Sequence, residues 1–341
     1  MPNENQKPKL YSLFSNGHLQ TIWTSIVGKY TLKKTSKFFF TRTRFKTPDN
    51  DFLDFDWLVN KKKTESSTLL VLFHGLEGSS ESQYSLAFAN IAIENSWSFV
   101  VINFRGCSGE INLAPRAYHA GDTEEIDWVL KKIDSIVTAD TIFCVGISLG
   151  GNALLKWLSM HDRALYSNIS RLKAIAVVSA PLDLVSSGTK LDNGVNGLIY
   201  SRFFLRTMKK KAKHKWNQFP GLFDLEKVIC ARTMKQFDNS FTAPVHKFLN
   251  VHDYWKKSSS IDEIKFITSH SLIVNAKNDP IVPSFNIKDL NITSENVEYW
   301  NPNFGGHVGF SSKINLKKFE SQFLWMPRMI GNWFLKTHKT K

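Results

Sequence analysis

The hydrophobic positions of the chain alternate between short strand-like runs and longer helical stretches after a β-rich start. Residues 38–45 and 52–59 carry β-prone, partly alternating patterns, and the segment between them contains Thr-Pro-Asp-Asn-Asp, a turn composition. We therefore expect these two segments to form an antiparallel hairpin at one edge of a sheet.

Four apolar runs without strict alternation follow, as expected for strands that are buried on both faces: residues 69–73, 99–103, 141–147 and 174–179. Helical stretches separate these runs, with apolar residues three and four positions apart: residues 84–94, 123–136 and 152–160. Asp122 followed by Glu125 predicts a capping box at the start of the second helix. Two more strands and a final helix complete the pattern, at residues 271–275, 297–300 and about 316–334.

The interval from residue 181 to residue 264 has no clear strand pattern, and we interpret it as a helical cap inserted into the fold. Residues 1–180 and 265–341 then form the core. This order of elements predicts an α/β fold whose central sheet is mostly parallel, with an antiparallel N-terminal hairpin and the cap over the carboxyl edge of the sheet.

The composition is that of an ordinary globular protein, with 341 residues, 42% of them hydrophobic and 22% charged. The cysteines are odd in number, far apart and without CxxC spacing, which favours neither a disulfide framework nor a zinc site: Cys107, Cys144 and Cys230. No secretory leader pattern and no run of about 18 apolar residues is visible. We expect a soluble, cytoplasmic protein.

The net charge of +14 permits attraction to anionic partners, and basic residues are concentrated at 209–215, beside Phe203, Phe204 and Trp216. We favour a cap helix whose apolar face covers a pocket while its lysines are solvated. Peripheral contact of this segment with an anionic membrane is the alternative. No nucleic-acid-binding motif is present, so no nucleic-acid partner is expected. A monomer is favoured, although the sequence does not fix the oligomeric state.

One candidate nucleophile lies in residues 146–150, Gly-Ile-Ser-Leu-Gly, where a predicted strand ends and a helix begins. This setting is typical of a nucleophile elbow, a strained turn that exposes the hydroxyl of Ser148. The two flanking glycines are needed because side chains would clash in so tight a turn. The pattern predicts that Ser148 attacks a carbonyl carbon.

A serine hydroxyl needs a base, usually a histidine that a carboxylate orients. His307 lies in a glycine-rich loop, Gly-Gly-His-Val-Gly, after the last strand and before the final helix, where such a base is expected. Three other histidines occur too early in the chain for this order of residues and are assigned structural roles: His74, His119 and His161.

The acid is expected in the turn after the penultimate strand, where Asp279 precedes Pro280. The proline biases Asp279 toward an extended backbone, which helps to fix the direction of the carboxylate. Asp183 is the alternative acid. The tetrahedral intermediate also needs two N–H donors, which we assign to the backbone of Leu149 and Leu76, the latter in a His-Gly-Leu-Glu-Gly loop.

Several ordered motifs extend this pattern over nearly the whole chain: Asn-Gly-His-Leu-Gln-Thr at residues 16–21, His-Gly-Leu-Glu-Gly-Ser at 74–79, Asn-Phe-Arg-Gly-Cys-Ser at 103–108, His-Ala-Gly-Asp-Thr at 119–123, the serine motif at 146–152, Phe-Asp at 237–238 leading to Thr-Ala-Pro at 242–244, Asn-Asp-Pro at 278–280 and Gly-Gly-His at 305–307. With them the chain resembles the YheT-like branch of the α/β-hydrolase superfamily, AB-hydrolase family 4. The animal members carry an N-terminal membrane segment, and the chain departs from them and is similar to the soluble bacterial members.

The resemblance implies an α/β-hydrolase fold, a triad of Ser148, Asp279 and His307, and hydrolysis of esters such as acylglycerols or short acyl esters without a cofactor. Thioester cleavage or acyl transfer by the same triad is an alternative, because one acyl-enzyme serves all three reactions. A non-catalytic binding protein on a hydrolase fold is a third reading, against which the complete triad argues.

Overall fold

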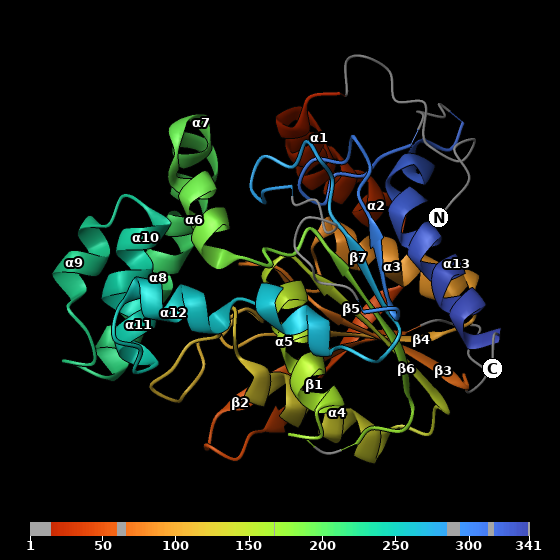
Figure 1. The fold of residues 1–341 in the computed structure, drawn as a ribbon, viewed down its shortest axis with the longest axis horizontal. Coiled ribbons are helices and arrows are strands. Elements are labelled where there is room, and N and C mark those ends of the chain that lie inside the picture. The colour runs from red at the N-terminus through yellow and green to blue at the C-terminus, as the bar shows by residue number, and fades with distance from the viewer. Residues whose placement is uncertain (1–14, 60–65, 167, 285–293, 313–316, 340–341) are drawn as a thin grey trace.

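A central sheet organises the computed structural model of the protein, which describes residues 15–59, 66–166, 168–284, 294–312 and 317–339. Eight strands of this part of the chain form one sheet in the order β1-β2-β4-β3-β5-β6-β7-β8 (Figure 1). The strands are β1 Phe39–Lys46, β2 Phe52–Val59, β3 Thr68–Phe73, β4 Ser98–Asn103, β5 Thr141–Ile147, β6 Leu172–Val178, β7 Ser271–Val274 and β8 Val297–Trp300. The pairs β1–β2 and β2–β4 are antiparallel, and the other pairs are parallel.

The predicted N-terminal hairpin is confirmed, with Phe39 opposite Val59 and Lys46 opposite Phe52, and β1 lies at the edge of the sheet. Its turn is closed by the N–H of Thr47, which donates to the carbonyl of Asp51 over 2.9 Å. All eight predicted strands are present, with ends that shift by no more than two residues. The predicted fold class is therefore confirmed.

Helices cover both faces of the sheet and define two apolar layers. In β3, Leu69, Val71 and Phe73 pack in one layer, against α4 Thr123–Ile136 and α5 Leu149–Asp162. The alternate residues of β3 pack in the other layer, against α3 Gln83–Glu94 and α13 Trp325–Lys339. Because successive strand side chains point to opposite faces, a strand between two helical layers is apolar at every position.

Three local predictions need correction. Helix α5 begins at Leu149 rather than at residue 152, directly after Ser148. The final helix begins at Trp325, after a 3₁₀ helix at Phe319–Leu324, and residues 313–316 lie outside the described part. Asp122 caps α4 by accepting from the N–H of Glu125, but the Glu125 carboxylate pairs with buried Arg105 and does not return to Asp122, so the reciprocal half of the capping box is wrong.

The N-terminal motif, whose structure the hydrophobic pattern did not predict, forms α1 Gly17–Trp23, a π turn at Thr24–Gly28 and α2 Lys29–Thr35. None of the helices in the described residues is long and apolar enough to cross a membrane.

Residues 181–264 contain helices and turns and no strand. Their elements are α6 Leu184–Asp192, α7 Gly194–Asn196, a π turn at Gly197–Ser201, α8 Arg202–Gln218, α9 Leu225–Cys230, α10 Met234–Phe237, a π turn at Asp238–Thr242, α11 Ala243–Val245, α12 Val251–Ser258 and a 3₁₀ helix at Ile261–Phe266. Figure 1 shows α6 to α11 gathered to one side of the sheet. They share an apolar cluster of their own, which includes Leu205, Val228 and Phe237. We refer to residues 181–264 as the cap; its boundaries as a separate domain stay a prediction.

Candidate active site

Ser148 occupies a strained turn between β5 and α5, with φ of 50° and ψ of −119°. Such a backbone is rarely adopted outside glycine and is retained where the surroundings enforce it. The flanking glycines are required as predicted: a Cβ at Gly146 would lie 2.5 Å from the Cα of Gly151, and one at Gly150 would lie 2.4 Å from the carbonyl oxygen of His74. The crowded elbow therefore fixes where the Ser148 hydroxyl points.

The structure brings Ser148, His307 and Asp279 into one hydrogen-bonded chain. The Ser148 Oγ lies 3.0 Å from His307 Nε2, and His307 Nδ1 lies 2.9 Å from Asp279 Oδ2. The three residues follow β5, β8 and β7, whose carboxyl ends meet at the same edge of the sheet. In this arrangement a proton can pass from the serine hydroxyl to the imidazole while the carboxylate holds the ring in one tautomer.

The Asp279 carboxylate is held in place by its own turn. It is buried, and its Oδ1 accepts from the N–H groups of Ile281 and Val282 over 2.8 and 2.9 Å. Lys190 of α6 donates to the carbonyl oxygens of Asp279 and Val282 over 2.6 and 3.0 Å, so the cap also holds this turn. Burial lowers the pKa of Lys190, although the nearby Asp279 opposes this effect.

Asp183, the alternative acid, is engaged elsewhere. Its carboxylate caps α6 by accepting from the N–H of Val185 over 2.9 Å, from that of Ser186 and from the Ser186 hydroxyl. The structure thus places Asp279, and not Asp183, against His307.

The loop after β3 presents a free N–H beside the serine. A Cβ at Gly75 would lie 3.1 Å from the Cβ of Ser148, so a side chain there would require Ser148 to shift by a few tenths of an ångström. The loop is fixed by Gly75 N–H donating to the Tyr84 hydroxyl over 3.1 Å and Glu77 N–H donating to the Tyr118 hydroxyl over 2.8 Å. Among the described residues the N–H of Leu76 between them has no acceptor, and neither has that of Leu149 at the start of α5.

Ser148 and His307 open into a cavity between the sheet edge and the cap, which Leu76 and Leu149 also line. The cap contributes mostly apolar side chains to its wall: Leu184, Leu191, Phe204, Met208, Met234, Phe237 and Phe241. Polar side chains line another part of the cavity wall, where Lys211 donates to Glu77 over 2.7 Å. The cavity can therefore hold an apolar group next to the serine.

The interpretation of the cap lysines as a solvated face is wrong for two of them. Lys211 and Lys215 line the cavity, whereas Lys210 and Lys213 are exposed. Lys215 is 3% exposed and donates to the carbonyls of Asn112 and Ala114 over 2.7 and 2.9 Å, and its burial lowers its pKa to about 8. The long aliphatic stem of a lysine can pack among apolar side chains while its ammonium reaches polar partners, which the apolar pattern of a helix does not reveal.

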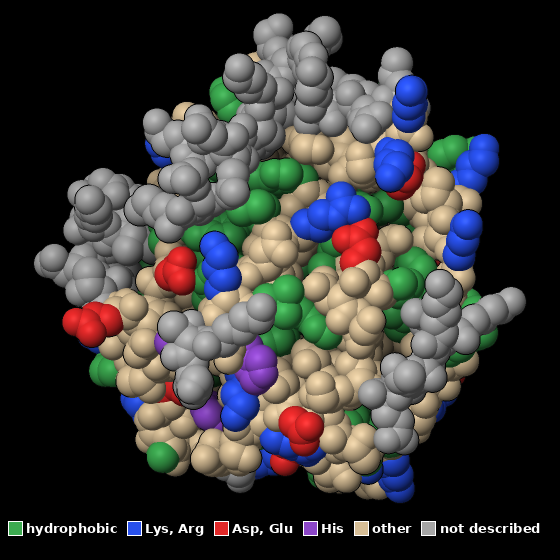
Figure 2. Space-filling model, turned by 90° about the vertical axis from the view of Figure 1, so that its right-hand side faces the viewer, with side chains coloured by type: hydrophobic (Ala, Val, Ile, Leu, Met, Phe, Trp, Pro, Cys, Tyr) green, Lys and Arg blue, Asp and Glu red, His purple; other side chains and the backbone are tan. Residues whose placement is uncertain are grey.

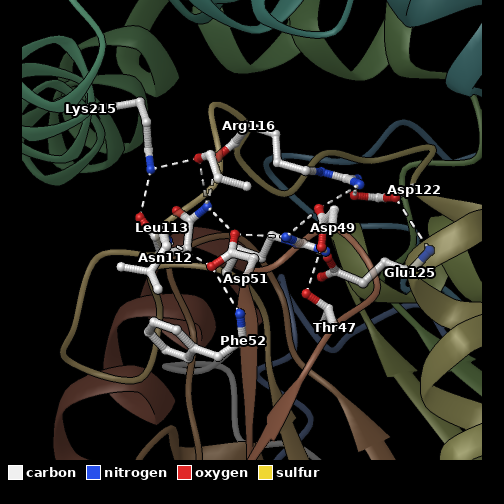
Figure 3. Close-up of polar contacts among 12 residues, drawn as sticks. Thr47, Asp49, Asp51, Phe52, Asn112, Leu113, Arg116, Asp122, Glu125 and Lys215 are labelled. Atoms are coloured by element: carbon white, nitrogen blue, oxygen red, sulfur yellow. Dashed lines mark hydrogen bonds and ion pairs between the residues drawn. The ribbon is translucent and has the colours of Figure 1, made fainter.

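A largely buried network of charges fixes the loop whose carbonyls accept from Lys215 (Figure 3). Arg105 pairs with Asp49 over 2.8 Å, with Asp51 over 2.7 Å and with Glu125. Burial, with a contribution from nearby Asp122, raises the pKa of Glu125 to about 7. The Asp51 carboxylate also accepts from the Asn112 side chain and from the N–H of Leu113 over 2.7 and 2.6 Å. This network anchors one wall of the cavity, a role that the sequence did not indicate.

Helix α1 holds the loops of His307 and Asp279, a role that the sequence pattern did not indicate. The hydroxyl of Thr21 accepts from the N–H of His307 over 2.8 Å and donates to the carbonyl of Gly17 over 2.7 Å. The Oε1 of buried Gln20 accepts from the Gly305 N–H and from the Asn278 amide, both over 2.9 Å. The N-terminal motif at residues 16–21 was the available signal, but nothing local to it indicates its contact with a loop 286 residues away.

The three histidines assigned structural roles have other partners. His74 is fully buried and accepts from the N–H of Phe104 over 3.0 Å, and burial lowers its pKa to about 4. His119 lies against His246 with 4.4 Å between ring centroids, and the Nε2 of His161 accepts from the N–H of Ile169. Among the described residues no group of three or more His, Cys, Asp or Glu could hold a metal ion, and Cys107, Cys144 and Cys230 are free thiols.

Comparison with known proteins adds sequence relatives and structural neighbours. Putative esterase YheT of Escherichia coli K12 is 32% identical over 322 residues, which are 94% of this chain and 90% of that protein. Phospholipase ABHD3 of Bos taurus is 27% identical over 275 residues, 79% of this chain, and the chain spans about two thirds of its length. The Pyrococcus furiosus esterase Pf2001 shares the fold with a TM-score of 0.53 at 14% identity, over 90% of this chain and 93% of that one.

The family model described as alpha/beta hydrolase fold matches residues 68–313, which include Ser148, Asp279 and His307. The resemblance inferred from the ordered motifs is thereby confirmed, since it names the same branch as the YheT match. This match and the sheet topology show that the chain belongs to the alpha/beta hydrolase fold family, in its YheT-like branch.

Proposed function

We propose that the protein is a serine hydrolase that cleaves carboxylic esters through an acyl-enzyme on Ser148. The observation that carries the proposal is the continuous hydrogen-bonded chain from Ser148 through His307 to buried Asp279. The names of the relatives, an esterase and a phospholipase, agree with a hydrolase.

In the first half of the reaction, Ser148 Oγ attacks the ester carbonyl carbon while His307 Nε2 takes the hydroxyl proton. The carbonyl electrons move onto oxygen, and the N–H groups of Leu76 and Leu149 stabilise the oxyanion, each contributing roughly 3 kcal/mol. Collapse of the intermediate expels the alkoxide, which leaves as the alcohol with the proton from Nε2. Water then attacks the acyl-enzyme with His307 again as base, and the carboxylic acid is released.

The substrate class follows from the wall of the cavity. Apolar side chains of the cap, among them Phe204, Met208 and Phe241, offer an acyl chain a place beside Ser148. A pocket of this kind discriminates weakly among chain lengths, since one methylene contributes only about 1–3 kcal/mol. Short acyl esters and acylglycerols therefore both fall within the proposed class.

The test of the nucleophile uses a fluorophosphonate probe and a panel of p-nitrophenyl esters of increasing acyl length. Ser148→Ala should fold normally and lose both labelling and esterase activity, and labelling at the wild-type rate would refute the assignment. The panel includes a thioester and an alcohol acceptor, so preferred thioester cleavage or transfer to the alcohol would reassign the reaction to thioesterase or acyltransferase.

The acid is tested by a matched pair of variants. Asp279→Asn should lower turnover by about 10⁴-fold with little change in fold, because His307 would be left in the wrong tautomer. Asp183→Asn should leave turnover near wild type, since Asp183 caps α6. The reverse result would move the acid to Asp183.

A further inference from the structure

The outer surface of the cap exposes a group of large apolar side chains. Val195, Leu198, Ile199 and Phe203 lie within nine residues of each other, and Leu198 and Phe203 are 58% and 66% exposed. They belong to α7, the following π turn and the first turn of α8. Figure 1 shows α7 at an outer tip of the cap, away from the sheet. Apolar side chains gathered on one surface in this way mark an interaction site.

A basic hollow lies directly beside these side chains. Arg202, Arg206 and Lys209 follow helical spacing along one face of α8, and Arg232 joins them from the segment after α9, with Leu198 at the same hollow. Helical residues three and four apart are surface neighbours, so the three α8 cations form a stripe.

The arginines of the hollow have no acidic partner in the described part of the chain. Lys209 donates to the carbonyl of Ile229 over 2.7 Å. The hollow also contains the carboxylate of Asp192, which accepts from the Ser201 hydroxyl and from the N–H groups of Met234 and Lys235 over 2.7 to 2.9 Å. Because Asp192 is satisfied by these groups, the guanidinium groups remain available to an external anion.

The side of the molecule that faces away from the cap differs in character. Figure 2 shows its Lys and Arg side chains dispersed, with acidic side chains beside several of them. Arg328 pairs with Glu94 over 2.6 Å and Lys33 with Glu81 over 3.3 Å. Within the part of the chain that the structure describes, the arginines without an acidic partner are those of the outer cap.

We infer that the outer cap face, defined as Leu198, Ile199, Phe203, Arg202, Arg206 and Arg232, docks the protein on an anionic membrane surface. Guanidinium groups bind lipid phosphates in the planar geometry that suits them, and the neighbouring apolar side chains enter the acyl boundary. Because these apolar side chains project from the tip of the cap, they suit insertion into a fluid lipid surface better than docking into a concave groove on another protein.

The position of α8 links this surface to the cavity. Its opposite face carries Phe204, Met208 and Lys211 into the cavity wall, so a docked membrane lies one helix away from the space beside Ser148. Docking itself does not depend on the proposed esterase activity; only the delivery of lipid esters to Ser148 rests on that function.

The experiment measures sedimentation of the full chain with vesicles of phosphatidylcholine alone and of phosphatidylcholine with phosphatidylglycerol in equal parts, at low and high salt. One variant carries Gln at Arg202, Arg206 and Arg232, and a second carries Ser at Leu198 and Phe203. Lys211 and Lys215 are left intact because they hold the cap on the core. A matched control removes three charges from α2 and the segment after it, with Gln at Lys29, Lys34 and Lys37.

Wild type should bind only the anionic vesicles and lose binding at high salt, because exposed charges are screened over about 8 Å at physiological ionic strength. Each cation near an anionic surface strengthens binding about fivefold, so the arginine variant should bind on the order of 100-fold more weakly while the control retains binding. The variant with Ser at Leu198 and Phe203 should also bind more weakly. This variant and the arginine variant should both hydrolyse a soluble ester at the wild-type rate if Ser148 is the nucleophile. Failure of that hydrolysis in all proteins would refute the proposed function and leave the docking result interpretable.

Three results would overturn the inference. Absence of wild-type binding to anionic vesicles at low salt would show that the arginines are only solvated. Equal loss in the control and the arginine variant would show a general charge effect, or docking through the N-terminal helices. If inorganic phosphate displaces the protein from the vesicles at an ionic strength that by itself leaves binding intact, the hollow binds a soluble phosphate and not a membrane.

Discussion

The contact between Thr21 and His307 offers a sharp test of how the catalytic loop is positioned. Thr21→Val keeps the shape of the side chain but removes the hydroxyl that accepts from the N–H of His307 over 2.8 Å. The same hydroxyl donates to the carbonyl of Gly17, so the substitution also detaches the loop from the first turn of α1. The side chain keeps its volume, so the effect comes from these two hydrogen bonds and from the contact of the Thr21 hydroxyl with the Tyr200 hydroxyl.

The expected loss of stability follows from the unpaired donor. Leaving a partly buried N–H without an acceptor costs about 1–3 kcal/mol in the free energy of unfolding. The kinetic effect is separate, because a folded variant keeps its activity unless His307 moves. The His307 Nε2 lies 3.0 Å from Ser148 Oγ, and a displacement of about 1 Å in such a geometry can lower the rate by about 100-fold. We expect kcat to fall by about 10- to 100-fold while KM changes little.

The assay combines urea unfolding with steady-state hydrolysis of a soluble p-nitrophenyl ester. Thr21→Ser retains the hydroxyl and should restore most of the lost kcat. Thr35→Val is the matched control, because Thr35 is exposed on α2 and its hydroxyl bonds only to the carbonyl of Thr31 in the same helix. If Thr21→Val keeps both wild-type kcat and wild-type stability, the proposed positioning role is wrong. A loss of stability with unchanged kcat would leave Thr21 a purely structural residue.

Three further outcomes can be measured. Gly75→Ala places a Cβ 3.1 Å from the Cβ of Ser148, so fluorophosphonate labelling and turnover should both fall by at least about tenfold, as expected when a reacting group is misplaced. Burial lowers the pKa of His74 to about 4, whereas His74 in the unfolded chain takes up its proton near pH 6.5. The free energy of unfolding of the wild type should therefore fall by up to about 3 kcal/mol more than that of His74→Asn as the pH falls from about 6.5 to 4, measured by urea unfolding. Lys215→Met leaves two carbonyls without their donor and should lower the free energy of unfolding by about 1–3 kcal/mol. Lys213→Met, on the exposed side of the same helix, should change the free energy of unfolding by no more than about 0.5 kcal/mol. Equal effects of the two substitutions would contradict the inward placement of Lys215.

The cap illustrates how one helix can present three different surfaces. Residues 204, 208, 211 and 215 of α8 face the cavity, Leu205 and Ala212 pack in the apolar cluster of the cap, and Arg202 and Arg206 face solvent. The two inward lysines interrupt the apolar stripe that a simple amphipathic helix would show. For this reason the charge of the segment does not predict how many of its lysines an external partner can reach.

The sequence by itself determined the strands, the helices α3, α4, α5 and α13 that pack on the sheet, and the elbow around Ser148. Buried strands between two helical layers are apolar throughout, and a serine between glycines at a strand end leaves few alternatives for the local backbone. These features depend on residues close together in the chain, so the pattern of neighbouring residues contains them. The same holds for the hairpin, whose turn residues at 47–51 are contiguous with its strands.

Only the tertiary structure decided which polar groups meet. It placed Asp279, the acid expected from the sequence, and not the alternative Asp183 against His307, and it brought Thr21 to the N–H of a residue 286 positions away. It also turned Lys215 inward to the carbonyls of Asn112 and Ala114. The direction of a side chain and the partner of a buried donor depend on how distant segments pack, because burial obliges each polar group to find a partner wherever the fold supplies one. A single sequence carries no local mark of that choice.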